Sequence, residues 1–592
     1  MKGPDRRSFL TYFSSIGLSA TLMPGVLWAR LQETKQQAIT MDMLKDAAAV
    51  AGVSFSDDQY AAMLDGVNRN FEVSEKLRQI EFDYSVAPPL YYNPLVPGVK
   101  VDRVKRQIPT SKPPQVERPN DLEQVAFWPV RQLAQLIKTK QVKSVEMTDM
   151  YLARLKKYNP KLNCAVTLTD DLAMKQARQA DSEITAGKYK GPLHGIPWGV
   201  KDIFAVPGYP TTWGTLPYKD RIIDSEASVV RLIREAGGVL VAKLATGELA
   251  NEDQWFGGRT NNPWDLNEGS SGSSAGPASA TAAGLVAFGV GTETGGSILG
   301  PASRCGVVGL RPTFGRVSRN GVMALAWNQD RVGPLCRSAE DAALVFNVIC
   351  QRDEFDQSVL DIPFNWDAAM DLRKLRIGYL EEELTASDRG SGTNGQALDV
   401  LKSLGIAPEP FRLPDSLRKL HELTNNGFSL GSPYASEAGA SFDDLVRFPD
   451  KWQQVKNTSR RTFVPPSRVA SAVDYLQMQR LRYVIMKQFA DAVVRFDVYI
   501  ANGIPRPGGV SYTYLSSAVS PGQANDPGKV HFDIANLCAY PAVAVPNGFD
   551  PGGHPTSIIF MGRLFNEAAA LAVAKAYQDA TKWHLKHPPQ FA

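Results

Sequence analysis

The spacing of apolar residues separates a helical beginning of the chain from a longer region of alternating helices and short buried strands. Between residues 41 and 78, apolar side chains recur three or four positions apart, which predicts amphipathic helices. These positions are Met43, Ala47, Val50, Tyr60, Met63, Leu64 and Val67. A Pro-rich, basic stretch follows up to Pro119 and is typical of a linker or of an arm that lies on the surface.

From Asp121 onward the pattern changes. Amphipathic helices are predicted over 130–140 and 144–158. Four brief apolar runs between Gly-rich turns predict buried strands. They cover 195–204, 238–243, 285–291 and 305–310. Runs of this kind are typical of strands that helices cover on both faces, which indicates an α/β fold.

The first 30 residues have the pattern of an export signal. Asp5-Arg6-Arg7-Ser8-Phe9-Leu10 precedes a mildly apolar stretch over 11–29, and the Arg pair resembles a twin-arginine signal. Pro24 and several Ser, Thr and Gly residues make this stretch a poor membrane anchor. We expect cleavage near Ala29 and an exported protein, periplasmic or secreted; the alternative is a disordered basic N-terminus.

These boundaries divide the chain into three parts. They are the signal at 1–30, an extension with its linker at 31–115, and a main domain at 116–592. The segment 415–470 is polar and irregular, and we expect it to be an insertion that shapes the substrate entrance. Its aromatic residues Phe428, Tyr434 and Trp452 are more typical of packing than of a binding pocket.

Composition excludes several classes of protein. The net charge of +4 over 592 residues gives no indication of a nucleic-acid or polybasic membrane partner. None of the six His stands in a metal-ligand spacing. The five Cys lie far apart, form no C-x-x-C pair and are odd in number, which argues against a disulfide framework.

Lys201 is the first candidate for chemistry. It ends the apolar strand-like run in Gly191-Pro-Leu-His-Gly-Ile-Pro-Trp-Gly-Val-Lys-Asp-Ile-Phe204. Burial would desolvate its ammonium group and lower its pKa toward neutrality, which makes it a possible general base. Asp202 is next in sequence, but neighbouring side chains of a strand point to opposite faces, so we do not expect it to pair with Lys201.

Two loops rich in Ser and Gly complete the candidate site. They are Ser270-Ser-Gly-Ser-Ser-Ala-Gly276 and Gly291-Thr-Glu-Thr-Gly-Gly-Ser-Ile298. Small residues let backbone N–H groups converge on one point, where they can stabilise an oxyanion. A Ser beside such donors attacks an acyl carbonyl only if a base removes its proton.

A competing interpretation makes Ser274 the nucleophile, because Gly272-Ser-Ser-Ala-Gly276 fits the G-x-S-x-G elbow. That elbow requires a buried strand directly before it. The preceding residues, 262–270, are polar and turn-like, so the context argues against this interpretation.

Together these segments resemble the amidase signature family. The resemblance runs from Asn262-Pro-Trp264 through the two loops to Cys305-Gly-Val-Val-Gly-Leu-Arg-Pro-Thr-Phe-Gly-Arg316, with the Lys201 segment upstream. Residues 536–566, with Pro541-Ala-Val-Ala-Val-Pro546, look like the closing segment of the family. The similarity therefore covers about residues 120–580, and it implies a large mixed β-sheet covered by helices on both faces.

The resemblance also implies roles for individual residues. Lys201 falls on the catalytic Lys, Ser273 on the bridging Ser, whose preceding peptide is typically cis, and Ser297 on the acylated nucleophile. The implied proton relay runs from Lys201 through Ser273 to Ser297. The N–H groups of Thr294, Gly295 and Gly296, with that of Ser297, would form the oxyanion hole. No metal and no organic cofactor are implied.

Three departures from the family pattern bear on the expectation. Ala275 and Pro277 replace the small residues that are usual after the bridging Ser. Leu299 stands where many members have Arg, which weakens the case for an anionic group on the substrate. The extension at 31–115 lies outside the common core.

The expected function is hydrolysis of a small, peptide or aryl amide by a free-standing amidase. Alternatives are the glutaminase-type subunit of a tRNA-dependent amidotransferase, an esterase or carbamate hydrolase, and a non-catalytic binding protein on the same fold. Export would exclude the amidotransferase, because tRNA charging is cytoplasmic. The expected partner is therefore an amide substrate, with no nucleic acid and no stable membrane insertion, and a homodimer is compatible with the sequence.

Overall fold

The computed structural model describes residues 39–51, 53–78, 93–384, 393–424, 433–467, 470–502 and 527–592. The expected export signal at 1–30, its cleavage position and Phe428 lie outside these residues. Among the described helices, none combines the length and the apolar character needed to cross a membrane.

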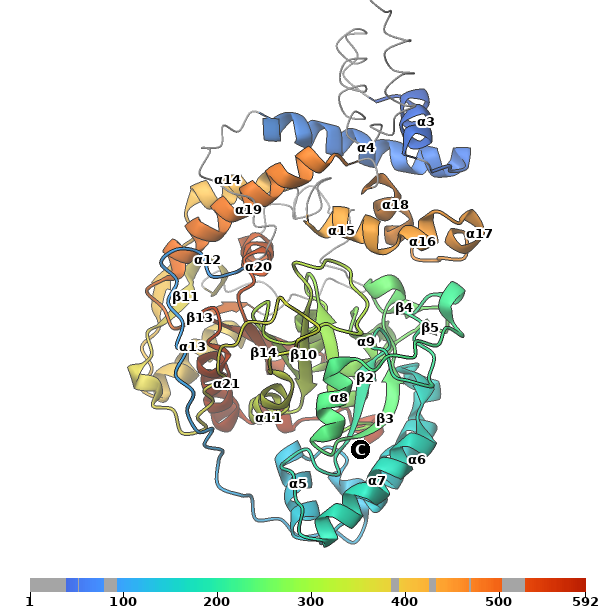
Figure 1. Cartoon of the computed structure of the whole chain (residues 1–592). Coiled ribbons are helices and arrows are strands. Elements are labelled where there is room, and N and C mark those ends of the chain that lie inside the picture. Colours follow the sequence, from blue (N-terminus) through green and yellow to red (C-terminus); the bar gives the residue numbers. More distant parts are fainter. Residues whose placement is uncertain are drawn as a thin grey trace, which may run out of the picture.

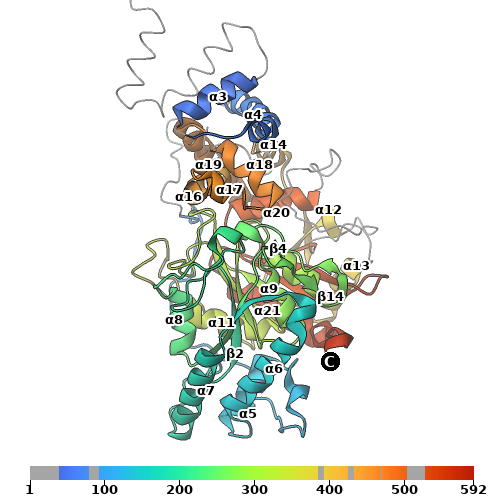
Figure 2. The ribbon, with the colours of Figure 1, turned by 90° about the vertical axis from the view of Figure 1, so that its right-hand side faces the viewer.

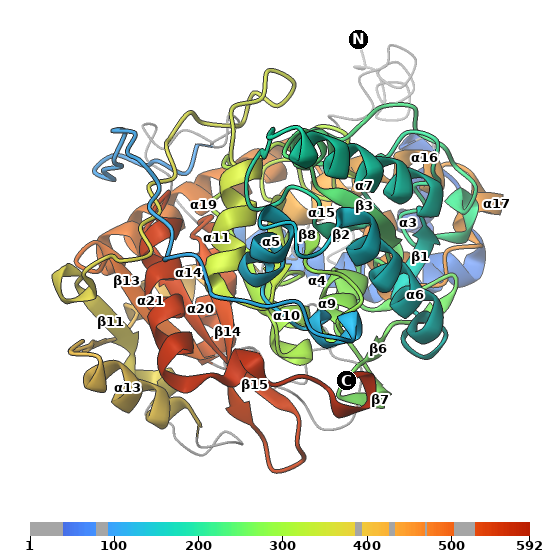
Figure 3. The same cartoon turned by 90° about the horizontal axis from the view of Figure 1, so that it is seen from below.

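The centre of the molecule is a mixed sheet of eleven strands in the order β1-β3-β2-β8-β10-β9-β14-β15-β13-β11-β12 (Figure 3). β2 pairs in parallel with β3 and β8, whereas β10 is antiparallel to β8 and β9. The strands are β1 (Ala165–Leu168), β2 (Pro197–Lys201), β3 (Val239–Leu244), β8 (Gly289–Glu293), β9 (Val308–Arg311), β10 (Arg331–Cys336), β11 (Ile377–Leu380), β12 (Glu409–Phe411), β13 (Val498–Asn502), β14 (Ala542–Phe549) and β15 (Pro555–Gly562). Two short hairpins, β4–β5 (Gln254–Trp255, Gly258–Arg259) and β6–β7 (Asn261–Asn262, Asp265–Gly269), lie outside this sheet.

Helices cover both faces of the sheet, and strand alternation decides which side chains each layer receives. Val543 and Val545 of β14 join the apolar core under one helical layer, while Ala542 and Ala544 join the core on the opposite face. The first layer contains α5 (Val130–Lys138), α8 (Ser228–Glu235), α11 (Ala339–Ile349) and α21 (Glu567–Thr581). The second contains α9 (Ala275–Ala282), α10 (Leu299–Cys305) and α20 (Pro527–Leu537), beside α6 (Ser144–Leu162) and α7 (Asp170–Thr185).

A group of helices at one end of the molecule forms what we call the cap, residues 415–493. It consists of α14 (Asp415–Glu422), α15 (Pro433–Ser441), α16 (Asp443–Val446), α17 (Pro449–Trp452), α18 (Thr458–Ser467) and α19 (Ala472–Val493). The remaining helices, α12 (Glu381–Leu384) and α13 (Thr393–Ser403), flank β11. Figures 1 and 2 place the cap at the end opposite to α5 and α7.

The N-terminal extension supplies two helices, α3 (Met41–Val50) and α4 (Asp57–Arg78), that lie on the outside of the cap (Figure 1). They share a small apolar core in which Met43, Leu44, Tyr60, Met63 and Val67 are buried. α4 packs against α18 and α19. The helices predicted between 41 and 78 are therefore present.

The predicted α/β fold with its large mixed sheet is confirmed. Helices begin at Val130 and Ser144 as predicted, and β2 and β3 lie within or beside the predicted strands. Two strand predictions are partly wrong. Residues 285–288 are buried turns before β8, and Cys305 ends α10 before β9 begins at Val308. Both errors arise because an apolar run indicates burial and does not distinguish a strand from a buried turn or helix end.

Candidate active site

Lys201 lies at the carboxyl end of β2 with none of its surface exposed. Its Nζ is 2.8 Å from the Ser273 hydroxyl and 2.9 Å from the Thr292 hydroxyl. The structure therefore joins two of the three residues that the sequence singled out. Thr292 is an additional partner that the sequence reasoning did not identify.

Burial lowers the pKa of Lys201 from its usual value to about 7, because an ammonium group loses its hydration in the interior. The negative charges of Asp330 and Glu293 oppose this shift, and the positive charge of Arg460 adds to it. A large share of the amine is thus uncharged near neutral pH, as a general base requires.

Ser273 lies in a tightly packed loop. The peptide bond between Gly272 and Ser273 is cis, and the Ser273 carbonyl accepts a hydrogen bond of 3.3 Å from the Gly247 N–H. A Cβ at position 272 would lie 1.7 Å from the carbonyl oxygen of Glu252. Only glycine fits there, because the two backbones approach so closely.

Ser274 uses its hydroxyl to hold the loop on β8. Its Oγ donates to the Thr292 carbonyl at 3.0 Å and accepts from the Thr292 N–H at 3.2 Å. Its own N–H donates to the Ser297 carbonyl at 3.1 Å. Ser274 therefore connects the two Ser-rich loops, and this engagement argues against a role as nucleophile.

Ser297 lies in the turn between β8 and α10 and is 4% exposed. The next two N–H groups, of Ile298 and Leu299, both donate to one carboxylate oxygen of Glu293, at 2.8 and 2.9 Å. The other oxygen of Glu293 pairs with Arg311 at 2.9 Å. A buried ion pair thus fixes the backbone that follows Ser297.

The turn before Ser297 presents backbone donors. Within the described part of the chain, the N–H groups of Thr294, Gly295, Gly296 and Ser297 donate no hydrogen bond. The φ of Gly296 is +116°, a conformation that favours glycine. The side chain of Thr294 donates to Asp330 at 2.6 Å, and its carbonyl accepts from Gln329 at 2.9 Å. These contacts hold the turn in place and leave its N–H groups available to an anion.

Asp202 does not contact Lys201. It pairs with Lys243 of β3 at 2.8 Å, and both side chains are fully buried. Thr212 also donates to Asp202 from its backbone and its hydroxyl. The sequence-based expectation that strand neighbours separate these two groups agrees with this arrangement.

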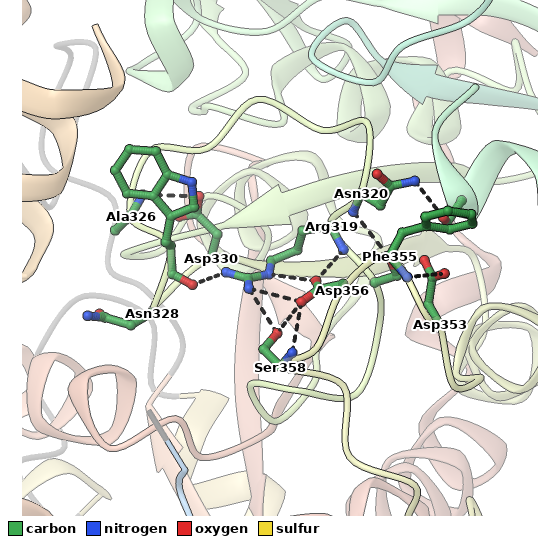
Figure 4. A network of polar contacts seen from close by, with 12 residues as sticks. Arg319, Asn320, Ala326, Asn328, Asp330, Asp353, Phe355, Asp356 and Ser358 are labelled. Carbon is green, nitrogen blue, oxygen red and sulfur yellow. Dashed lines mark hydrogen bonds and ion pairs between the residues drawn. The ribbon is translucent and has the colours of Figure 1, made fainter. Parts of the chain in front are cut away.

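A cavity of about 200 Å³ approaches the site from the side of Thr292 and Asp330. Figure 4 shows Arg319 of its wall held by Asp356 and Ser358. Arg319 Nη2 donates to Ser358 at 2.8 Å, and Nη1 donates to the Trp327 carbonyl. The remaining lining residues are Asn320, Val322, Met323, Ala324, Trp327, Val332 and Phe355. Since Arg319 is fully engaged, the wall is rigid and nearly neutral.

One group of side chains in the described ranges could in principle hold a cation: Asp265, Glu268 and His554, on the surface between β7 and β15. Arg304 already neutralises Glu268 at 3.0 Å, and His554 contacts Asp550 at 3.1 Å. The group is therefore a surface ion network, and it stands apart from Lys201, Ser273 and Ser297.

Four residues around the site escaped the sequence analysis: Thr292, Glu293, Arg311 and Asp330. A usable signal exists for Glu293 and Arg311, because each is a charged residue that ends a short apolar strand. The same signal identified Lys201. For Asp330 no such pattern is present in the sequence.

A family model described as Amidase matches residues 146–571 of the chain. The chain belongs to the amidase family. The matched region contains Lys201, Ser273 and Ser297, and the resemblance drawn from the sequence is thereby confirmed. This amidase is an enzyme that acts on carboxylic amide C–N bonds.

Curated relatives of this amidase include two bacterial glutamyl-tRNA(Gln) amidotransferase subunits, both of the A type. The one from Methylobacillus flagellatus is 32% identical over 78% of this chain and 99% of its own. The one from Marinomonas sp. is 34% identical over 77% of this chain and 97% of its own.

Solved structures give a complementary comparison. The peptide amidase from Stenotrophomonas maltophilia matches with a TM-score of 0.66 and 27% identity, over 79% of this amidase and 99% of that chain. A bacterial aryl acylamidase matches with a TM-score of 0.67 at 23% identity, over 78% and 98% of the two chains, which supports the fold alone.

Proposed function

We propose that this amidase is a serine amidohydrolase in which Ser297 is the nucleophile, Ser273 the bridging hydroxyl and Lys201 the general base. The observation that carries the proposal is the 2.8 Å contact between the Lys201 amine and the Ser273 hydroxyl in a fully buried setting. A buried amine with a pKa of about 7 can accept a proton at neutral pH. The second contact, to Thr292, orients the amine.

The chemistry follows from this arrangement. Uncharged Lys201 accepts the proton of Ser273 while Ser273 accepts that of Ser297, and the Ser297 oxygen forms a bond to the amide carbon. The carbonyl electrons move onto oxygen, where the N–H groups of Thr294, Gly295 and Gly296 stabilise the negative charge. When the C–N bond breaks, the relay returns the proton to the leaving amine. Water then attacks the acyl ester by the same relay, and the carboxylic acid leaves.

The region around the nucleophile favours an acyl group without negative charge. Leu299 occupies the second position after Ser297 and is buried in an apolar cluster with Ile298 and Phe532. No cation stands at that position to attract a carboxylate. We therefore propose an uncharged small, peptide or aryl amide as substrate. The likeness to a peptide amidase supports this class.

A second candidate is the glutaminase component of a tRNA-dependent amidotransferase. Relatives named for that enzyme, 32–34% identical over more than three quarters of this chain, favour it. Leu299 argues against it, since glutamine carries an α-carboxylate. Co-purification with partner subunits, together with ammonia release from glutamine, would support this candidate.

We also propose that the chain is exported through its twin-arginine segment. A variant in which Arg6 and Arg7 are both replaced by Lys should accumulate in the cytoplasm, whereas the parent should reach the periplasm or the medium. Cell fractionation with immunodetection measures this. Equal distribution of the two proteins would contradict export by this route.

The central experiment uses a fluorophosphonate probe, which reacts with an activated serine. We expect labelling at Ser297, identified by peptide mass spectrometry, and none in Ser297→Ala. Ser274→Ala is the matched control and should retain a labelled Ser297. Labelling at Ser274, or full turnover in a folded Ser297→Ala protein, would contradict the proposal. A screen of peptide amides, anilides, carbamates, esters and free glutamine then separates amidase from esterase and glutaminase.

A further inference from the structure

Arg460, in cap helix α18, is a buried cation that binds the catalytic domain. It is 1% exposed. Its guanidinium donates to the carbonyls of Leu249 at 3.0 Å and Ala250 at 2.9 Å, and to the Tyr434 hydroxyl at 2.6 Å. Within the described residues no carboxylate pairs with Arg460, so its positive charge is not locally neutralised.

The segment that Arg460 holds has an unusual backbone. Leu249, Ala250 and Glu252 have φ values of +52°, +57° and +58°. Residues other than glycine rarely adopt this left-handed region, because the Cβ approaches the neighbouring carbonyl. Three such residues within four positions require support from outside the segment, and Arg460 binds two of them.

The start of α18 binds the same segment a second time. Glu248 accepts the N–H groups of Lys456 and Asn457 at 2.8 and 2.7 Å. Its other oxygen accepts from Thr215 at 2.7 Å. The Asn251 side chain donates to Asn457 at 3.0 Å. The segment 248–252 is thus held along its length by this helix of the cap.

The same segment supports the bridging serine. The N–H of Gly247 donates to the Ser273 carbonyl at 3.3 Å, and the carbonyl of Glu252 is the atom that a Cβ on Gly272 would meet. The Asp253 carboxylate accepts the Ser271 N–H at 3.1 Å. A chain of direct contacts therefore leads from Arg460 to the loop of Ser273, which contacts Lys201.

Electrostatics connect Arg460 to the base independently of these contacts. Its charge lowers the pKa of Lys201, in addition to the larger effect of burial. A like charge in the interior disfavours the ammonium form of a nearby amine.

We propose that Arg460 is a positioning residue for the Lys201–Ser273 pair. It fixes the backbone on which the Ser273 loop rests, and it keeps a positive charge near the base. This inference rests on the proposed function of Lys201, Ser273 and Ser297.

The test compares Arg460→Met, which removes the charge, with Arg460→Lys, which keeps the charge but cannot bridge two carbonyls. The measurement is the rate constant of fluorophosphonate labelling at Ser297 from pH 5 to 10. We expect both variants to label about 10-fold more slowly or less. The acid limb of the profile should move upward by about half a pH unit or more in Arg460→Met and stay in place in Arg460→Lys.

Arg337→Met is the matched control. Arg337 is also buried and donates to the carbonyls of Thr281 and Val286, remote from the described site contacts of Ser273. Its loss should lower the melting temperature, leave the acid limb in place and change the labelling rate less than about threefold. If Arg460→Met does not fold, Arg460→Gln carries the same comparison, since it is also neutral and keeps a donor for one carbonyl.

A folded neutral variant with an unmoved acid limb, or with a labelling rate within about threefold of the parent, would overturn the proposal. Equal limb shifts in Arg460→Met and Arg337→Met would overturn it as well. Failure of the proposed function gives a different result, because probe labelling would then persist in Ser297→Ala whatever residue occupies position 460.

Discussion

Glu293 and Arg311 form an ion pair of 2.9 Å in which neither side chain reaches solvent. The other oxygen of Glu293 accepts the two N–H groups that follow Ser297, and Arg311 also donates to the Tyr540 carbonyl at 3.0 Å. The pair thus joins the nucleophile turn to strands β8 and β9 and to the segment that leads into β14. It fixes the orientation of Ser297 from below.

Breaking this pair should be costly in stability. Arg311→Met leaves the Glu293 carboxylate buried without its cation, and we expect the free energy of unfolding to fall by about 3–5 kcal/mol. Urea denaturation followed by circular dichroism measures the change. The double variant Glu293→Gln/Arg311→Met should recover part of the loss, because no charge is then left unpaired. A double variant less stable than Arg311→Met would contradict this account.

The pH dependence of acylation should report Lys201. Its pKa of about 7 places the acid limb of the labelling profile near pH 7, with activity lost below that pH as the amine gains a proton. Lys201→Met should reduce the rate about 10²–10⁴-fold and remove the limb. The measurement is the fluorophosphonate rate constant from pH 5 to 10. A Lys201→Met protein that retains the limb would assign it to another group.

Stability should depend on pH through the same residue. The pKa of Lys201 is about 7 when folded and near 10.4 in an unfolded chain. Between these values the unfolded state binds more protons, so stability rises with pH. The parent should therefore gain about 3–5 kcal/mol relative to Lys201→Met from pH 7 to pH 10.5. Below pH 7 the difference between the two proteins should be constant. Parallel urea titrations measure this, and equal pH dependence in both proteins would contradict the prediction.

Gly296→Ala tests the oxyanion turn. The φ of +116° at Gly296 disfavours any side chain, although an added Cβ would meet only Phe532, at 3.5 Å. We expect the turn to change conformation and labelling to fall about 10²-fold or more. Gly98→Ala is the control: its φ is +94° and a Cβ there meets open space. Equal labelling by the two variants, measured as before, would refute a role for this turn in stabilising the oxyanion.

The sequence predicts the elements that depend on local pattern. Apolar runs located β2 and β3, and helical spacing located α5 and α6, because burial on one or two faces leaves a periodic trace. Lys201 was identifiable for the same reason, as a charge at the end of a buried run. The order of the eleven strands leaves no such trace, since it is set by long-range packing.

The support of the site was less accessible to prediction. Arg460 and Leu249 are separated by 211 positions and meet only when the cap is in place. The left-handed backbone at Leu249 and Ala250 has no Gly or Asn to announce it. Thr292 stands in the signature loop, but its contact with Lys201 depends on the pairing of β2 with β8. Such relationships are tertiary and cannot be read from local pattern.

The attachment of α18 to residues 248–252 has a consequence for protein engineering. A chimera that receives the cap of a relative, in order to widen its substrate range, would also replace Arg460 and Asn457 and the helix on which α4 packs. Turnover would then change together with selectivity, even for substrates that never touch the exchanged helices. Grafts that preserve these two side chains are the rational starting point.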